Sequence, residues 1–301
     1  MKLPCSHRAF VTFGMINVFL LGAGVARAAG TPLLEYTFND TGTTAASTGS
    51  DTTSLTLYNS SGTATDLHGA AGSGVSGAAS DFAFDNTAAT GMGTGFNGGS
   101  AASVGDLQGV DTLKSFTLAG WFKTDGTTVI GNNARLLDNQ NGAAGTGFIL
   151  FASGSSGTLT LQINNNQYVS TSGAYNATQS WVFFAVTDDG QGNVSFYIGD
   201  TATSVSLVNS VSGTAILESD NATSLSIGNA TAGNRPFDGL MDDIRVYGSS
   251  TVNDSNAVLT QSDLESLRSA DISAIPEPAT YTLLGGLVAL SIVGLRRRRR
   301  S

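Results

Sequence analysis

Paired carboxylates are the residues most able to support catalysis in this sequence. Retaining glycoside hydrolysis needs two carboxyl groups about 5 Å apart on one face of the fold. Only three glutamates precede the C-terminal Pro-rich motif, Glu35, Glu218 and Glu265, and no two of them lie in one expected strand. Asp242 and Asp243 are adjacent, so an extended strand would turn their side chains to opposite faces. These spacings predict that the protein is not an enzyme.

Other catalytic, metal-binding and nucleic-acid-binding chemistries lack the residues they need. A Ser–His–Asp triad or a His-rich zinc site would have to use His68, which stands alone in a Gly-rich stretch. We expect His68 to be an exposed loop residue without a role. The single cysteine, Cys5, excludes a disulfide framework. The net charge of −9 argues against a nucleic-acid partner, which would require a basic surface.

Asp242 is the acidic residue with the most specific placement. It shares alternation with the apolar residues Ile244 and Val246 in an expected strand, so we expect it to point toward the core. A buried carboxylate is costly unless hydrogen bonds or a metal satisfy it, and hard oxygen ligands suit Ca²⁺. The alternative is a structural carboxylate satisfied by backbone N–H groups or by Arg235 or Arg245.

Aromatic side chains are the other candidate chemistry, because sugar rings stack on exposed aromatic rings. Trp121 and Phe122 are adjacent in an expected strand, so one should face the second sheet and the other the outer surface. The alternative is that these rings serve only in packing. The candidates for stacking are Trp121, Tyr168, Tyr175, Trp181 and Tyr197.

The elements that must position these residues are short strands. Runs of period-2 alternation are separated by Gly, Ser, Thr, Asn and Asp, which predicts an all-β, two-sheet antiparallel sandwich. One helix is expected over Thr260–Arg268. The expected strands are Leu33–Phe38, Ser54–Tyr58, Asp81–Asp85, Phe116–Phe122, Ala134–Asp138, Gly147–Ala152, Leu159–Ile163, Val182–Val186, Val194–Ile198, Ser224–Gly228 and Gly239–Tyr247.

The N-terminal 28 residues have the three parts of a secretory signal peptide. A short basic start is followed by an apolar run over residues 9–25 and by small residues at Ala26 and Ala28. We expect cleavage between Ala28 and Ala29; the alternative is a first transmembrane helix. The ectodomain is then expected over residues 29–272.

The C-terminus, residues 275–301, also has three parts. A Pro276-Glu277-Pro278 motif precedes an uncharged apolar stretch, residues 280–295, which we expect to form one transmembrane helix. The basic cluster that follows should hold this end in the cytoplasm. The alternative is an ordinary tail anchor. The cluster consists of Arg296, Arg297, Arg298, Arg299 and Arg300.

This tripartite end resembles the PEP-CTERM sorting signal of Gram-negative surface proteins. Ala279 stands where that family usually has Ser. The resemblance implies that an exosortase is a partner, that the precursor is anchored in the inner membrane, and that the mature form reaches the cell surface or medium. Such proteins commonly accompany exopolysaccharide production.

The order of segments in the ectodomain resembles the laminin-G-like, concanavalin A-like jelly roll. Residues 115–122, 181–186 and 193–199 follow one another as in that family, and residues 237–247 (FDGLMDDIRVY) look like its closing strand. The resemblance implies that the opening strand, residues 33–38, meets the closing strand near the centre of a sheet. Members of the family often carry calcium near these two strands, which makes Asn39, Asp40 and Asp242 the candidate ligands.

Together these patterns predict an exported, non-catalytic jelly-roll module that binds carbohydrate or another exopolysaccharide-matrix component. The alternative is a purely structural surface or biofilm protein without a discrete ligand. A degenerate glycoside hydrolase is the least supported interpretation, because the required pair of carboxylates is missing.

Overall fold

The structure is a computed structural model. It describes residues 30–273 except 90–97, 104, 106, 127–132, 141–144, 155, 177–178, 215–216 and 218–223. The predicted cleavage site at Ala28 and Ala29, the Pro276-Glu277-Pro278 motif, the helix over 280–295 and the cluster Arg296–Arg300 lie outside the described residues. Within the described ranges, no helix has the length and apolar character needed to cross a bilayer.

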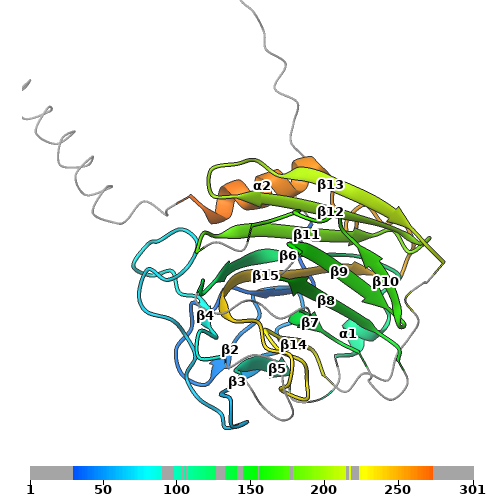
Figure 1. The fold of residues 1–301 in the computed structure, drawn as a ribbon. Coiled ribbons are helices and arrows are strands. Elements are labelled where there is room, and N and C mark those ends of the chain that lie inside the picture. Colours follow the sequence, from blue (N-terminus) through cyan, green and yellow to red (C-terminus); the bar gives the residue numbers. More distant parts are fainter. Residues whose placement is uncertain are drawn as a thin grey trace, which may run out of the picture.

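The described chain forms two antiparallel sheets that lie one over the other (Figure 1). The seven-stranded sheet consists of β1 (Leu34–Tyr36), β15 (Gly239–Ser249), β6 (Ser115–Thr124), β11 (Val182–Asp188), β12 (Asn193–Asp200) and β13 (Ser206–Ser212) in spatial order, with β4 (Phe84–Asp85) also beside β15. The eight-stranded sheet consists of β10 (Asn166–Val169), β9 (Thr158–Ile163), β8 (Phe148–Ser153), β7 (Ala134–Asp138), β14 (Ser226–Ile227), β5 (Ser100–Ser103), β3 (Leu55–Tyr58) and β2 (Thr44–Ala45). The predicted two-sheet sandwich is confirmed.

The main core lies between the two sheets, where large rings from both inner faces meet. Phe116 of β6 stacks on Phe148 of β8 with ring centroids 5.5 Å apart. A second apolar cluster lies on the outer face of the seven-stranded sheet, where Leu264 of a helix packs with Trp121. Phe122 belongs to the main core and Trp121 to the second cluster, so the prediction that they face opposite sides is confirmed.

Helix α2 (Gln261–Asp271) covers this outer face beside β12 (Figure 1). It starts where the sequence predicted, because Thr260 caps it and forms a reciprocal capping box with Asp263. It continues three residues past the predicted end at Arg268, which brings Asp271 over the sheet. The other described helix is a single turn, α1 (Gln108–Asp111).

The opening strand β1 pairs with the closing strand β15, as predicted, with Leu34 opposite Val246 and Tyr36 opposite Ile244. The position of this pair differs from the expectation. Both β1 and β4 lie on the outer side of β15, so the pair is at the edge of the seven-stranded sheet and not near its centre.

Four strands were not predicted: β2, β5, β10 and β13. Their sequences, TA, SAAS, NQYV and SLVNSVS, carry little apolar alternation. Backbone pairing with a neighbouring strand holds each of them in its sheet, so their side chains leave only a weak signal in the sequence.

Candidate functional site

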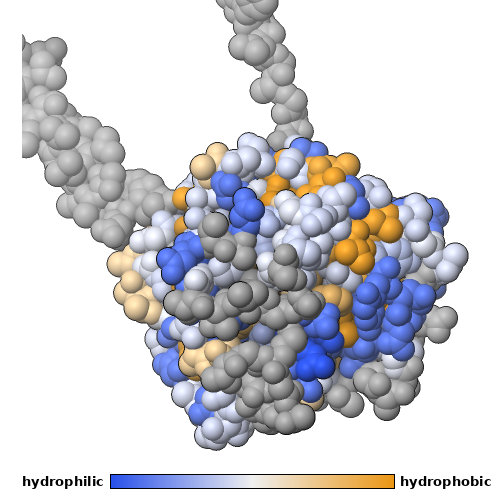
Figure 2. All heavy atoms as spheres, viewed as in Figure 1, coloured by the Kyte–Doolittle hydropathy of each residue, from blue (hydrophilic) through white to orange (hydrophobic). Residues whose placement is uncertain are grey.

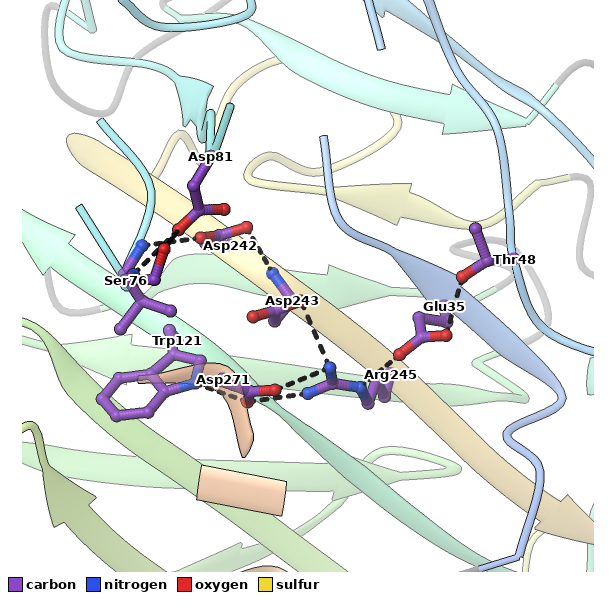
Figure 3. Close-up of polar contacts among 10 residues, drawn as sticks. Glu35, Thr48, Ser76, Asp81, Trp121, Asp242, Asp243, Arg245 and Asp271 are labelled. Atoms are coloured by element: carbon purple, nitrogen blue, oxygen red, sulfur yellow. Dashed lines mark hydrogen bonds and ion pairs between the residues drawn. The ribbon is translucent and has the colours of Figure 1, made fainter. Parts of the chain in front are cut away.

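Arg245 is the centre of a charged network on the outer face of the seven-stranded sheet (Figure 3). Its Nε donates to Glu35 Oε1 at 2.7 Å. Its Nη1 and Nη2 each donate to the carboxylate of Asp271 at 2.8 Å, and Nη2 also lies 3.2 Å from Asp243 Oδ1. Trp121 Nε1 donates to Asp271 Oδ2 at 2.8 Å. The network therefore ties β1, β6 and α2 to the closing strand.

A β-bulge in β15 brings Asp242 and Asp243 to the same side as Arg245. The register with β6 shifts between Asp242 and Arg245, and Asp243 has φ of 49°. Asp242 pairs with Trp121, which belongs to the cluster under α2. The expectations that Asp242 faces the core between the sheets and that the two aspartates point to opposite faces are therefore wrong, because the extra residue resets the alternation.

Asp242 is fully buried, and backbone N–H groups satisfy both of its carboxylate oxygens. Val75 N donates to Oδ2 and Asp243 N donates to Oδ1, both at 2.8 Å. Burial, together with the nearby carboxylates of Asp243 and Asp81, raises the pKa of Asp242 well above its usual value. Burial also raises the pKa of Asp243 to about 7, although Arg245 opposes that shift.

A hollow of about 220 Å³ opens beside this network, between the 76–81 segment and the end of α2. Its lining includes the acids Asp81, Asp243 and Asp271 and the amide of Asn39. Two of these acids, Asp243 and Asp271, are bonded to Arg245, which offsets part of their charge.

The three predicted calcium ligands are engaged separately. Asn39 Oδ1 accepts from Phe82 N at 2.7 Å, and Asp40 Oδ2 accepts from Ala46 N at 2.6 Å. Asp242 is satisfied as described above, which fits the alternative of a structural carboxylate. The described part of the chain contains no group of three or more His, Cys, Asp or Glu arranged to hold a metal ion. Calcium binding stays a prediction.

The outer face of the eight-stranded sheet carries a second polar cluster. Arg135 Nε lies 3.3 Å from Asp138 Oδ2, and the Arg135 guanidinium stands 5.1 Å from the ring centroid of Phe151. Burial raises the pKa of Asp138. Among the described strand residues of this face, Asp138 is the only carboxylate, so these strands do not supply the acid pair that glycoside hydrolysis requires.

Beside this cluster, four amide side chains form a chain of hydrogen bonds that we call the amide ladder. Gln167 Nε2 donates to Gln162 Oε1 at 3.2 Å, and Gln162 Nε2 donates to Gln140 Oε1 at 3.1 Å. Both Gln140 and Gln162 donate to Asn165 Oδ1 at 3.3 Å. These residues were not predicted from the sequence, although the density of Asn and Gln over residues 162–167 was a readable signal.

The aromatic candidates for sugar stacking serve in packing. Trp121, Tyr168, Tyr175 and Trp181 are all at most 8% exposed, and Tyr197 is half-buried. The structure therefore supports the alternative of packing for the four buried rings.

His68 also differs from expectation. Its side chain is only 4% exposed, because it pairs with Phe84 across a β-bridge and its Nδ1 lies 2.8 Å from Asp66 Oδ1.

Comparison with solved structures identifies the same fold in bacterial toxins. The binding domain of botulinum neurotoxin serotype D/C VPI 5993 matches with a TM-score of 0.53 at 13% identity, over 80% of this chain and 52% of that chain. The receptor-binding domain of the mosaic serotype C/D gives 0.53 at 12% identity, over 80% and 51%. A botulinum neurotoxin type C structure, from work on cell entry through two ganglioside molecules, gives 0.51 at 13%, over 81% and 52%.

This chain spans about half the length of those toxin domains, and at such identities the likeness is one of fold. No curated protein sequence matches the chain. A family match does cover residues 96–254, which is more than half of the 301 residues. On that match and on the two-sheet antiparallel sandwich, the chain belongs to the concanavalin A-like lectin/glucanases superfamily, with a laminin G-type domain.

Proposed function

We propose that this chain is the precursor of an exported surface protein whose jelly roll binds carbohydrate, or another exopolysaccharide-matrix component, without catalysing a reaction. The observation that carries this proposal is the outer face of the eight-stranded sheet. Among its described strand residues, Asp138 is the only carboxylate and is paired with Arg135, while Gln162 and Gln167 present neutral amides. Amides both donate and accept hydrogen bonds, as sugar hydroxyls do, whereas hydrolysis needs two carboxyl groups.

A glycan array with the purified chain tests the binding function. We expect retention of at least one glycan class, with no shortening of that glycan on long incubation. Release of reducing ends from a bound polysaccharide would contradict the non-catalytic part of the proposal. Absence of binding to every glycan and to extracted matrix would contradict the binding part.

Export and sorting form the second part of the proposal. It rests on the Ala28/Ala29 cleavage signal, on Pro276-Glu277-Pro278 and on the basic cluster at the C-terminus. We propose that an exosortase of a Gram-negative host processes the chain at the inner membrane. Replacing Pro276 and Pro278 with Ala should leave the unprocessed chain in the inner-membrane fraction. A normal surface yield of that variant would overturn the exosortase assignment.

Calcium binding near the opening and closing strands is a further part of this proposal. A ligand bound only to the folded state raises its stability. If Asn39, Asp40 or Asp242 binds Ca²⁺, excess EDTA should lower the melting temperature, and added Ca²⁺ should restore it. An unchanged melting curve in EDTA would leave Asp242 as a structural carboxylate held by backbone N–H groups.

A purely structural role is the second candidate function. The burial of Trp121, Tyr168, Tyr175 and Trp181 favours it, because these rings are not available for stacking on a sugar. The glycan array decides between the two candidates.

A further inference from the structure

The segments that form β8, β9 and β10 carry no charged residue, although the chain as a whole is acidic; the ion-paired Arg135 and Asp138 of β7 lie beside them, with Arg135 over Phe151 of β8. No charged residue occurs between Asp138 and Asp188, a stretch that contains all three strands. The segment 201–217, which contains β13, is also uncharged. Strand β13 lies against β10 at the rim of the sandwich, where Thr171 N donates to Asn209 Oδ1 at 3.1 Å. The uncharged segments therefore share one side of the molecule.

The amide ladder lies entirely within the uncharged stretch between Asp138 and Asp188. Gln162 of β9 and Gln167 of β10 stand directly opposite each other in the strand register. Figure 2 shows hydrophilic side chains gathered over this part of the molecule, on the right of the view. Gln167 and Asn165 are exposed, whereas Gln140 and Gln162 are half-buried. The two inner amides thus hold the two outer ones in fixed orientations.

The outer amides keep unused hydrogen-bonding capacity. Within the described chain, Gln167 Oε1 accepts no hydrogen bond and Asn165 Nδ2 donates none, while Gln162 Nε2 donates twice. Gln167 Oε1 is therefore a hydrogen-bond acceptor on an exposed side chain that the network holds in place, whereas Asn165 Nδ2 lies against Gly145. Binding of a ligand to the ladder costs little entropy of the protein side chains, because the ladder is already ordered.

We infer that the amide ladder is a binding surface for a neutral polysaccharide. This inference rests on the proposed carbohydrate-binding function and specifies its ligand. Sugar hydroxyls match the paired donors and acceptors of amides. The ladder itself contains no cation, and Arg135 beside it is already paired with Asp138. An acidic polysaccharide would also approach a protein with a net charge of −9, which repels polyanions. Residues 29–275 carry six basic and 22 acidic residues, so the processed form is more acidic still.

Affinity electrophoresis of the full chain, in gels cast with neutral or acidic polysaccharides, tests the inference. The neutral probes are dextran, hydroxyethyl cellulose and galactomannan, and the acidic probes are alginate and polygalacturonate. We expect retardation by at least one neutral probe and none by the acidic ones. The double variant Gln162→Met/Gln167→Met keeps the side-chain length and should weaken that retardation about tenfold, because two amide partners are lost.

The control variant is Gln179→Met, which removes an amide outside the ladder. Gln179 Nε2 donates to the carbonyl oxygen of Asp125, the residue after β6, at 2.8 Å. It should bind as the wild type does. Gln167→Ala is a second test, because it changes only an exposed residue. It should lower the affinity for the neutral probe without changing the melting temperature.

Each outcome bears on a different claim. Wild-type affinity for a neutral probe in both ladder variants would overturn the ladder as the site but leave carbohydrate binding intact. Tighter binding of the acidic probes would overturn the assignment of a neutral ligand. Failure of the wild type to bind any probe, in these gels and on the array, would overturn the proposed function and this inference with it.

Discussion

At the scale of single residues, Arg245 holds the outer face of the seven-stranded sheet together, because Glu35, Asp243 and Asp271 all bond to it. The sequence correctly indicated that Asp242 is buried and that backbone N–H groups could satisfy it. Arg245, the other suggested partner, bonds to Glu35, Asp243 and Asp271 instead. The predicted side of the sheet for the Asp242 side chain was wrong, because the bulge at Asp243 cannot be read from alternation alone. The contact of Asp271 with Arg245 was also beyond prediction, since it depends on how α2 docks.

Replacing Arg245 with Met should destabilise the fold by about 3–5 kcal/mol, because Asp243 and Asp271 would stay buried without their cation. Urea unfolding of both proteins measures the difference. Arg235→Met is the matched control. Arg235 forms no ion pair with a described residue, so the change should cost less than about 1 kcal/mol. Equal effects of the two substitutions would show that the network does not support stability.

Asp188 should make stability depend on pH. It is fully buried, Oδ1 accepts from Gly190 N at 3.1 Å, and Oδ2 has no hydrogen-bond partner among the residues that the structure describes. Burial raises its pKa to about 7 in the folded state, above the usual 3.8, so the folded state holds the proton more tightly than the unfolded state. The stability present below about pH 4 is therefore lost as pH rises toward 7.

Asp188→Asn removes this titration. The stability of the variant relative to the wild type should rise by about 4 kcal/mol between pH 4 and pH 8, from a shift of roughly three pKa units. Urea unfolding at a series of pH values measures this difference. A difference that stays constant across that range would show that Asp188 is not protonated in the folded protein.

At the scale of elements, apolar alternation predicted the strands that line the core and the helix that covers the sheet. It failed for β2, β5, β10 and β13, whose side chains are mostly small or polar, so that backbone pairing and not an apolar face holds them in their sheets. The amide ladder was missed because its members are far apart in sequence. They are Gln140 just after β7, Gln162 of β9, Asn165 of the turn between β9 and β10, and Gln167 of β10, and the strand register brings them together.

The start of α2 offers a direct test of the capping box. Thr260→Ala removes the hydroxyl that accepts from Asp263 N at 3.2 Å, and should destabilise the protein by about 1 kcal/mol. Ser262 is the second residue of the same helix. Ser262→Ala keeps the capping box and should change stability by less than about 0.5 kcal/mol. The midpoints of urea unfolding report both values, and a smaller loss for Thr260→Ala than for Ser262→Ala would refute the role of the cap.

For the whole molecule, the pairing of β1 with β15 closes the sandwich between segments about 200 residues apart in sequence. The sequence predicted the architecture because the closing segment 237–247 carries a recognisable pattern. Its position at the edge of the sheet could not be predicted, since that depends on β4 sharing the same side of β15.

We expect residues 29–275 to unfold in a single cooperative transition. A fragment that ends at Asn234 lacks β15, so it would expose an edge of β6 and lose Phe237, Met241 and Ile244 from the main core. That fragment should be insoluble. Calorimetry and solubility assays test both expectations, and a soluble fragment with its own cooperative melt would show that a smaller domain folds independently.

The bidentate contact between Asp271 and Arg245 has a mechanical consequence. Asp271 is two residues before the last described residue, Ser273, while Arg245 is in the long central part of β15. If the protein is held at the cell surface by its C-terminal part, tension enters the fold through the end of α2. The load then passes across two parallel N–H···O bonds into a strand that is hydrogen-bonded on both sides, where many bonds share it. The ion pair would transfer a pulling force from the end of α2 to β15, so that the force does not unwind α2 or detach it from the sheet.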